Sequence, residues 1–169
     1  KVHDRYQVEV SAHELITTGF ATTLPPATVQ HIRDLYDGAV ADFDDTVGKV
    51  LAGLEARGLS GNTIVILTSD HGEDLYDPGS TLGHGTNFFG GDQSTRVPFL
   101  MRVPTKDGWL RPGTEVAAVT RNADIAPTLL ELLGLPLTAG VEGTSLMPLV
   151  RGDVADLSLP AFAETCYLF

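Results

Sequence analysis

The stretch TIVILTSDHGED, residues 63–74, joins an apolar run to a cluster of polar side chains. Residues 63–69 are apolar except at the ends, which is typical of a strand covered on both faces of a parallel sheet. The run stops at Asp70 and His71, and Gly72 follows, where the missing side chain lets the backbone turn at once. We therefore predict that Asp70 and His71 leave the carboxyl end of a buried strand, where open α/β sheets bind their ligands.

The residues before this stretch predict a long amphipathic helix. Between residues 29 and 54, apolar side chains recur at spacings of three and four, which places them on one helix face. Pro26 stands where a helix begins, and Gly58 stands where one ends. A helix, a tight turn and a buried strand form half of a βαβ unit, so the sequence indicates an α/β fold with a mostly parallel sheet flanked by helices. We expect the helix and the strands to bury one another.

Further elements follow along the chain. Residues 70–95 form a polar, glycine-rich loop, and loops of this length inside a compact domain are usually functional or disordered. Residues 96–104 read as a second strand, and 115–119 as a short third one. A second helix is predicted at 123–134, and a terminal strand at 159–169.

Composition excludes several classes of partner. The 169 residues suit one domain, and 11 basic against 22 acidic residues give a net charge of −11. Such a charge argues against nucleic acid or an anionic membrane as the main partner. No apolar run approaches the roughly 20 residues that a membrane span needs. The single cysteine, Cys166, excludes an intrachain disulfide, and we interpret it as a structural thiol.

Two places in the loop carry candidate chemistry. A carboxylate beside an imidazole, as in Asp70 and His71, is a natural pair of ligands for a divalent cation. The alternative is that Asp70 caps a turn and His71 is a surface histidine. His84 lies between two glycines, so its ring is uncrowded and could reach an anionic substrate or a leaving-group oxygen. The alternative for His84 is again a plain surface residue.

Three segments in order resemble the sulfatase family, a branch of the alkaline phosphatase-like superfamily. The first is LYDGAVADFDDTVGKVLAGLEARGLSGNTIVILTSDHGEDL, residues 35–75. The second, GHGTNFFGGDQSTRVPFLMRVP at 83–104, resembles the family's following segment with its Arg-Val-Pro strand. The third, at 122–153, is similar to the family's Asp-x-x-Pro-Thr helix and Gly-x-Ser-Leu turn. The resemblance implies an alkaline phosphatase-like sandwich fragment, with residues 1–169 as the C-terminal portion of a sulfatase-like catalytic domain.

The resemblance also implies roles for four residues. Asp70 matches the family's metal-ligand aspartate, and His71 stands where sulfatases carry Asn or His. The implied cofactor is a divalent metal ion, calcium in typical sulfatases and manganese or zinc in related phosphonate and phosphate ester hydrolases. His84 falls where the family contacts the sulfuryl group. His3, in HDRY, resembles the histidine of a His-x-Pro-Tyr motif that helps to protonate the leaving group, although Arg5 replaces the proline.

The family's nucleophile, in a Cys/Ser-x-Pro-x-Arg motif, has no counterpart in these 169 residues. The resemblance therefore implies that the chain contributes metal ligands and a substrate-binding histidine to a hydrolase of small-molecule sulfate esters. Alone, the chain is expected to be inactive and to bind calcium no tighter than about millimolar. Two alternatives stay open: a phosphodiester or phosphonate monoester hydrolase of the same superfamily, and a non-catalytic domain that binds an anion or a partner.

Overall fold

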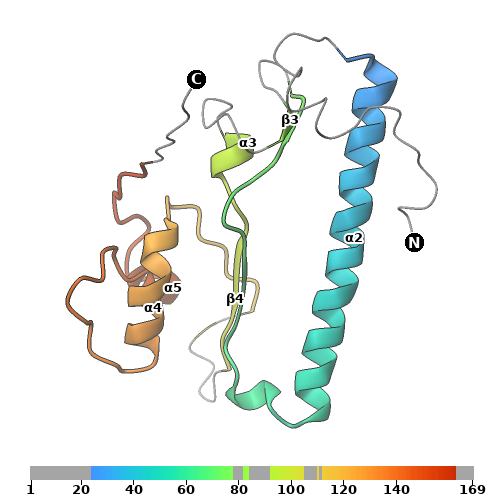
Figure 1. The fold of residues 1–169 in the computed structure, drawn as a ribbon. Coiled ribbons are helices and arrows are strands. Elements are labelled where there is room, and N and C mark those ends of the chain that lie inside the picture. The colour runs from blue at the N-terminus through green and yellow to red at the C-terminus, as the bar shows by residue number, and fades with distance from the viewer. Residues whose placement is uncertain (1–23, 78–81, 84–91, 105–109, 111, 163–169) are drawn as a thin grey trace. The chain divides into compact units, whose positions relative to one another are not determined.

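The computed structural model describes residues 24–77, 82–83, 92–104, 110 and 112–162 (Figure 1). The chain divides into two compact units. The first unit is Lys1–Arg102 with Glu164–Phe169, and the second unit is Val103–Ala163. The loop that carries Asp70 and His71 belongs to the first unit.

Helix α2, Pro26–Ala56, is the longest element of the first unit and confirms the helix predicted from the apolar spacing. Proline occupies its start, where the missing N–H has no partner to lose. At its end Gly58 is left-handed, with φ 67°. The Gly58 N–H donates to the carbonyl of Glu55 and the Leu59 N–H donates to the carbonyl of Leu54, both at 2.9 Å. This pair of bonds is a Schellman motif, and glycine is needed there because of the positive φ.

The apolar face of α2 is less covered than the sequence predicts. No residue of the helix is buried, and Tyr36, Val40, Phe43 and Val50 are each more than 40% exposed. The expectation that helix and strands bury one another is therefore wrong for the described residues. Length explains the difference: 31 residues span about 46 Å of helix, whereas each four-residue strand spans only about 13 Å.

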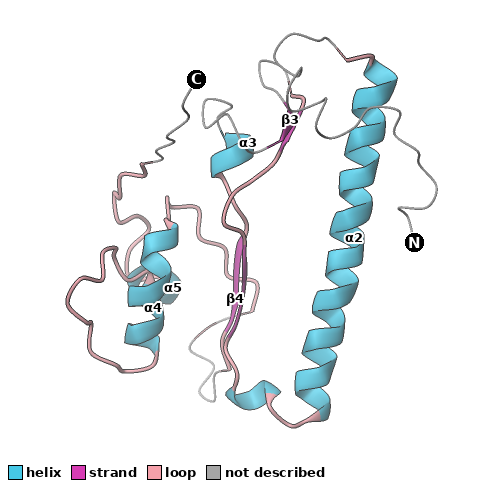
Figure 2. Ribbon diagram, in the orientation of Figure 1, coloured by secondary structure: helices cyan, strands magenta, loops and turns pink. Residues whose placement is uncertain are grey.

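Strand β1, Val65–Thr68, pairs with β4, Phe99–Arg102. The pairing is antiparallel, with Ile66 opposite Met101. A second antiparallel pair joins β2, Asp74–Leu75, to β3, Leu82–Gly83 (Figure 2).

The mixed helix and strand composition agrees with the predicted fold class, but the strand pairs described here are antiparallel where a parallel arrangement was expected. A parallel pair needs a crossover that returns the chain to the same end of the sheet. The helix described between β1 and β4 is α3, Asp92–Thr95, and its four residues are too few for such a return.

The second unit holds the buried apolar side chains of the described residues. The 3₁₀ turn η4, Asn122–Asp124, leads into α4, Ile125–Leu132, which confirms the predicted second helix. Helix α5, Met147–Arg151, follows after a loop. Leu146, Met147 and Leu149 are at most 5% exposed.

One of two strands predicted for this region is absent, and the other lies mostly outside the described residues. Residues 115–119 are irregular, and Val116 and Val119 are exposed by 41% and 51%. Their β-branched composition favours a strand, but no described segment pairs with them. Residues 159–162 are irregular as well, and the rest of the predicted terminal strand lies outside the described residues. Among the described helices, none has the length and apolar character to cross a membrane.

Candidate metal site

Asp70 and His71 lie next to one another two residues beyond the end of β1. The backbone N–H of His71 donates to Asp70 Oδ1 at 3.0 Å, and His71 Nε2 lies 3.6 Å from the same oxygen. The Ser69 hydroxyl donates to the carbonyl of His71 at 2.6 Å and holds the turn. The structure therefore brings the carboxylate and the imidazole together, as the sequence predicts.

The electrostatics of Asp70 suit a metal ligand. Hydrogen bonds from backbone amides, first its own, lower the pKa of this carboxyl, and the His71 ring lowers it further whenever that ring is protonated. The side chain is 86% exposed. Asp70 is therefore an open carboxylate that carries a negative charge at neutral pH.

The hydrogen bonding of His71 fits a metal ligand too. Its Nδ1 lies 2.8 Å from the carbonyl oxygen of Gly72, and a carbonyl only accepts, so Nδ1 carries the proton. In a neutral ring the lone pair is then on Nε2, the atom nearer Asp70. Histidines that bind metals commonly donate their other ring N–H to a backbone carbonyl. Asp70 and His71 thus have the donor atoms that a divalent cation needs, although two ligands are only part of a shell.

Gly72 has a different role from the one expected. Its N–H donates to the carbonyl of Ser94 at 2.8 Å, which ties the loop to α3. A Cβ at position 72 would overlap the backbone carbonyl of Gln93. Close approach of two backbones, rather than a tight turn, is what requires glycine at this position.

The structure does not describe the other two predicted site residues. His3 and His84 lie outside the described residues, so their roles stay predictions. Asp74, close to Asp70 in sequence, is fully buried in β2. Within the ranges that the structure describes, no three His, Cys, Asp or Glu side chains are grouped as a metal site.

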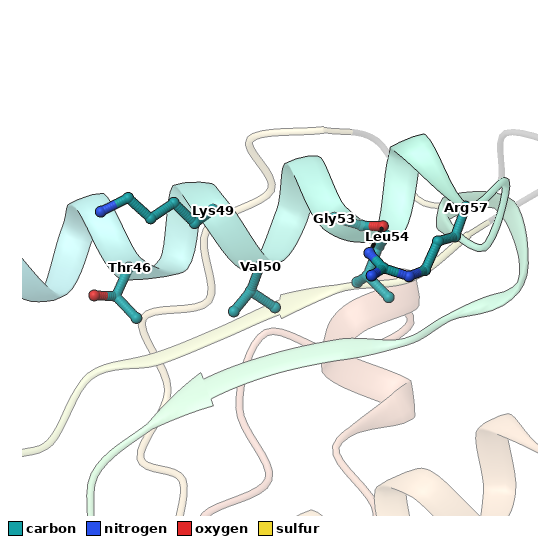
Figure 3. Close-up of a pocket in the computed structure, with 6 residues that line it drawn as sticks. All are labelled: Thr46, Lys49, Val50, Gly53, Leu54 and Arg57. Atoms are coloured by element: carbon teal, nitrogen blue, oxygen red, sulfur yellow. Dashed lines mark hydrogen bonds between the residues drawn. The ribbon is translucent and has the colours of Figure 1, made fainter.

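Two hollows in the described surface are lined by residues other than Asp70 and His71. One, with a volume of about 440 Å³, runs along α2 and is lined by side chains of that helix and Arg57, including Val50 and Leu54 (Figure 3). Another, of about 620 Å³, lies in the second unit between residues 114–117 and 149–155. Neither contains Asp70 or His71, so we do not place the chemistry in them.

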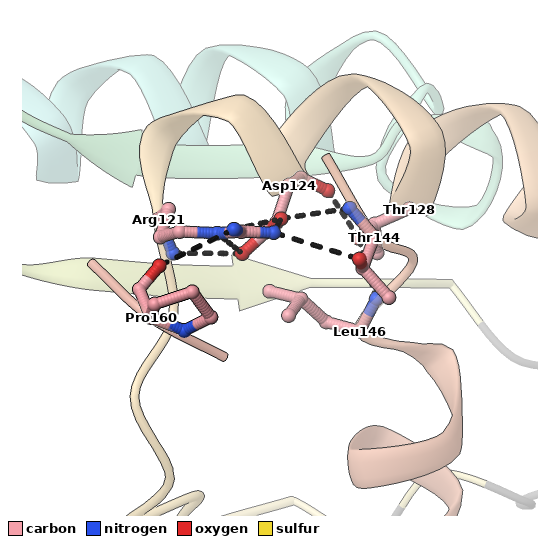
Figure 4. A network of polar contacts seen from close by, with 6 residues as sticks. All are labelled: Arg121, Asp124, Thr128, Thr144, Leu146 and Pro160. Atoms are coloured by element: carbon pink, nitrogen blue, oxygen red, sulfur yellow. Dashed lines mark hydrogen bonds and ion pairs between the residues drawn. The ribbon is translucent and has the colours of Figure 1, made fainter. Parts of the chain in front are cut away.

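A buried carboxylate organises the start of α4 (Figure 4). Asp124 has no exposed surface, and its carboxylate accepts hydrogen bonds from the Arg121 guanidinium at 2.7 Å, the Arg121 N–H at 2.9 Å and the Thr144 N–H at 2.8 Å. Burial by itself raises the pKa of Asp124, but the hydrogen bonds from Arg121 and Thr144 outweigh it and the net pKa is lowered.

Thr128 completes this network. Its hydroxyl donates to the carbonyl of Asp124 and accepts from the Leu146 N–H at 2.9 Å. Gly143, at φ 105°, passes so close to the carbonyl of Ala123 that a Cβ would overlap it. The Asp-x-x-Pro-Thr segment therefore fastens the turn at 143–146 to α4, which is a structural role.

Comparisons with known proteins agree with the sequence resemblance. The chain is 40% identical over 141 residues to steryl-sulfatase of Rattus norvegicus, covering 77% of this chain and 24% of the relative. Among solved structures, phosphonate monoester hydrolase SpPMH from Silicibacter pomeroyi matches with a TM-score of 0.67 and 30% identity, over 78% of this chain and 24% of that one. BT4656, solved in complex with its substrate D-glucosamine-2-N,6-O-disulfate, matches with a TM-score of 0.57 and 30% identity, over 66% and 21% of the two chains.

The fold and these neighbours define the alkaline phosphatase-like class of α/β hydrolases, whose members generally use a divalent metal ion. A family model described as Sulfatase matches residues 2–135, and the chain belongs to the sulfatase family. It spans about a quarter of the length of the proteins it matches.

Arg33 is a residue of this region that the sequence analysis missed. It extends from α2 to the backbone and side chain of residues 75–77, just beyond the candidate ligands. No local signal identifies it, because a single basic residue on a helix is ordinary and its partners are more than 40 positions away in sequence.

Proposed function

We propose that the chain is the C-terminal portion of the catalytic domain of a metal-dependent sulfuric ester hydrolase, with Asp70 and His71 as metal ligands. The observation that carries this proposal is the pairing of an exposed, ionised carboxylate with a suitably protonated imidazole at the end of β1, in a member of the sulfatase family. Calcium is the metal we favour, because the resemblance is to typical sulfatases.

Each residue has a defined part in this proposal. When bound, the metal ion would neutralise negative charge on the ester oxygens. Asp70 supplies an anionic oxygen and His71 supplies Nε2 to its shell. His84 binds the sulfuryl group or assists the leaving group, and His3 holds the proton that the departing alcohol takes up. The substrate is a small-molecule sulfate ester, and the nucleophile belongs to a part of the enzyme beyond these 169 residues.

A phosphonate monoester or phosphodiester hydrolase is the second candidate. The match to SpPMH at a TM-score of 0.67 favours it, and so does the histidine that follows Asp70. The 40% identity to a steryl-sulfatase and the family match favour sulfate esters. Fold alone does not choose between them, because one fold hosts several reactions.

The test uses the full-length protein with paired aryl esters, a sulfate, a phosphonate and a phosphate, that share one leaving group. We expect the highest kcat/KM on the sulfate ester. Replacing Asp70 by alanine should lower kcat/KM at least about 100-fold, because the metal loses a charged ligand. Asp45→Ala is the matched control, since Asp45 is an exposed aspartate on α2 that pairs with Lys49.

Two outcomes would contradict the proposal. A clear preference for the phosphonate or phosphate ester would establish the second candidate. Near wild-type turnover by Asp70→Ala would show that this carboxylate is not a metal ligand.

A further inference from the structure

We propose that Arg33 is a positioning residue: it fixes the far end of the segment 70–77, which begins with Asp70 and His71, and so holds these ligands ready for the metal. This inference rests on the proposed function, because it concerns the same site. Arg33 lies on α2, and its hydrogen bonds go to residues 75–77 rather than to Asp70 or His71.

The contacts of Arg33 converge on three consecutive residues. Its Nε donates to the carbonyl of Leu75 at 3.3 Å, and its Nη2 donates to the carbonyl of Tyr76 at 3.4 Å. The shortest contact joins Nη2 to Asp77 Oδ1 at 2.8 Å, with both side chains 36% exposed. A planar guanidinium can make such a set of bonds at once, whereas a lysine ammonium is a single point charge.

Tyr76 supplies an independent reason to regard this contact as more than a surface ion pair. Its φ is 64°, in the left-handed region that a tyrosine rarely adopts. Arg33 donates a hydrogen bond to the carbonyl of Tyr76. The hydroxyl of Tyr76 accepts another from the Leu24 N–H at 3.1 Å, just before α2 begins. A strained residue persists where the surroundings over-determine it, and such residues cluster at functional sites.

The segment between the ligands and Arg33 is fastened along its length. The Gly72 N–H is bonded to the carbonyl of Ser94, and β2 pairs with β3 through Asp74 opposite Gly83. Arg33 closes the far end at residues 75–77. Releasing that end would let the segment sample more conformations, and the entropy of ordering it would then weaken metal binding.

The experiment titrates metal-free full-length protein with calcium chloride in a calorimeter and follows amide hydrogen exchange of residues 70–77 without metal. Arg33→Gln should raise the dissociation constant for calcium several-fold, below the roughly tenfold minimum for residues that bond a metal ligand directly, because Arg33 acts through residues 75–77. The same variant should speed exchange in this segment. Both readouts of Arg33→Lys should lie between those of wild type and Arg33→Gln. Lysine keeps a positive charge for Asp77 but lacks the several fixed N–H donors of the guanidinium. Lys49→Gln is the matched control: Lys49 makes one exposed ion pair on the same helix, and its loss should change neither readout.

The outcomes separate this inference from the function on which it rests. Unchanged calcium affinity and exchange in Arg33→Gln, or a lower melting temperature with unchanged calcium affinity, overturns the positioning role. If the wild-type protein binds no calcium and hydrolyses no sulfate ester, the proposed function fails. In that case the exchange of residues 70–77 still decides whether Arg33 holds the segment. Should Arg33→Gln fail to fold, Arg33→Lys provides the same readouts.

Discussion

Asp124 is a buried carboxylate whose contribution to the stability of the fold depends on pH. Its folded pKa lies below the ordinary value of 3.8, since the bonds from Arg121 and Thr144 outweigh the effect of burial. A depressed folded pKa means that the unfolded chain binds the proton more tightly. The stabilisation is therefore present above about pH 4 and is lost as the pH falls through the folded pKa.

We expect Asp124→Asn to lower the free energy of unfolding by about 3 kcal/mol at pH 7, because it leaves the Arg121 guanidinium without its charged partner. The difference from wild type should shrink below pH 4. Urea unfolding at a series of pH values measures both effects. Glu131→Gln is the control, since its pair with Arg151 is 39–45% exposed and should contribute less than about 1 kcal/mol. If the difference in free energy of unfolding between Asp124→Asn and wild type stays constant below pH 4, the assignment is contradicted.

At the scale of elements, the contact between Gly72, next to the proposed ligands, and α3 depends on the absence of a side chain at position 72. Gly72→Ala would drive a Cβ into the carbonyl of Gln93, and backbone gives way less easily than a side chain. We expect a loss of about 2 kcal/mol of stability, typical of overpacking, and weaker calcium binding by the full-length protein.

Gly48→Ala is the matched control for that variant. A Cβ at Gly48 meets nothing within 4 Å, and this glycine lies inside α2, so alanine should be neutral or mildly stabilising. Thermal unfolding and calcium titration of both variants test the pair. Equal melting temperatures for the two alanine variants would show that the close approach at Gly72 is unimportant.

The elements differ in how far the sequence predicts them. The sequence predicts helix α2 because its signals are local: apolar spacing, Pro26 at its start and Gly58 at its end. It does not predict the antiparallel pairing of β1 with β4, since an apolar run does not encode the direction of its partner. The strand predicted at 115–119 is wrong for a related reason. The composition of these residues suits a sheet, but composition does not show whether a neighbouring strand is present.

The candidate site also contains residues that the sequence predicts and one that it does not. Asp70 and His71 are adjacent in sequence, so the sequence alone places them together. Arg33 could not be found in this way, because its partners lie 42 to 44 positions further along the chain. The roles of His3 and His84 rest on the family resemblance and stay predictions.

At the scale of the whole molecule, the proposed metal site is only partial within the described residues. Calcium normally takes six to eight oxygens, and the part of the chain that the structure describes groups fewer than three metal-binding side chains. We expect the isolated chain to bind calcium no tighter than about millimolar and to hydrolyse no aryl sulfate. Calorimetric titration, with Asp70→Ala as the control, checks this. Micromolar affinity in the isolated chain would reveal a complete site.

The uncovered apolar face of α2 has a consequence for how the isolated chain behaves in solution. Aromatic and aliphatic side chains along the helix favour self-association, while a net charge of −11 keeps molecules apart. The repulsion acts over a Debye length of about 10 Å at 0.1 M salt and shrinks to about 3 Å at 1 M. Added salt therefore removes the barrier and leaves the attraction, so the colloidal stability of this chain is a property of its buffer as much as of its fold.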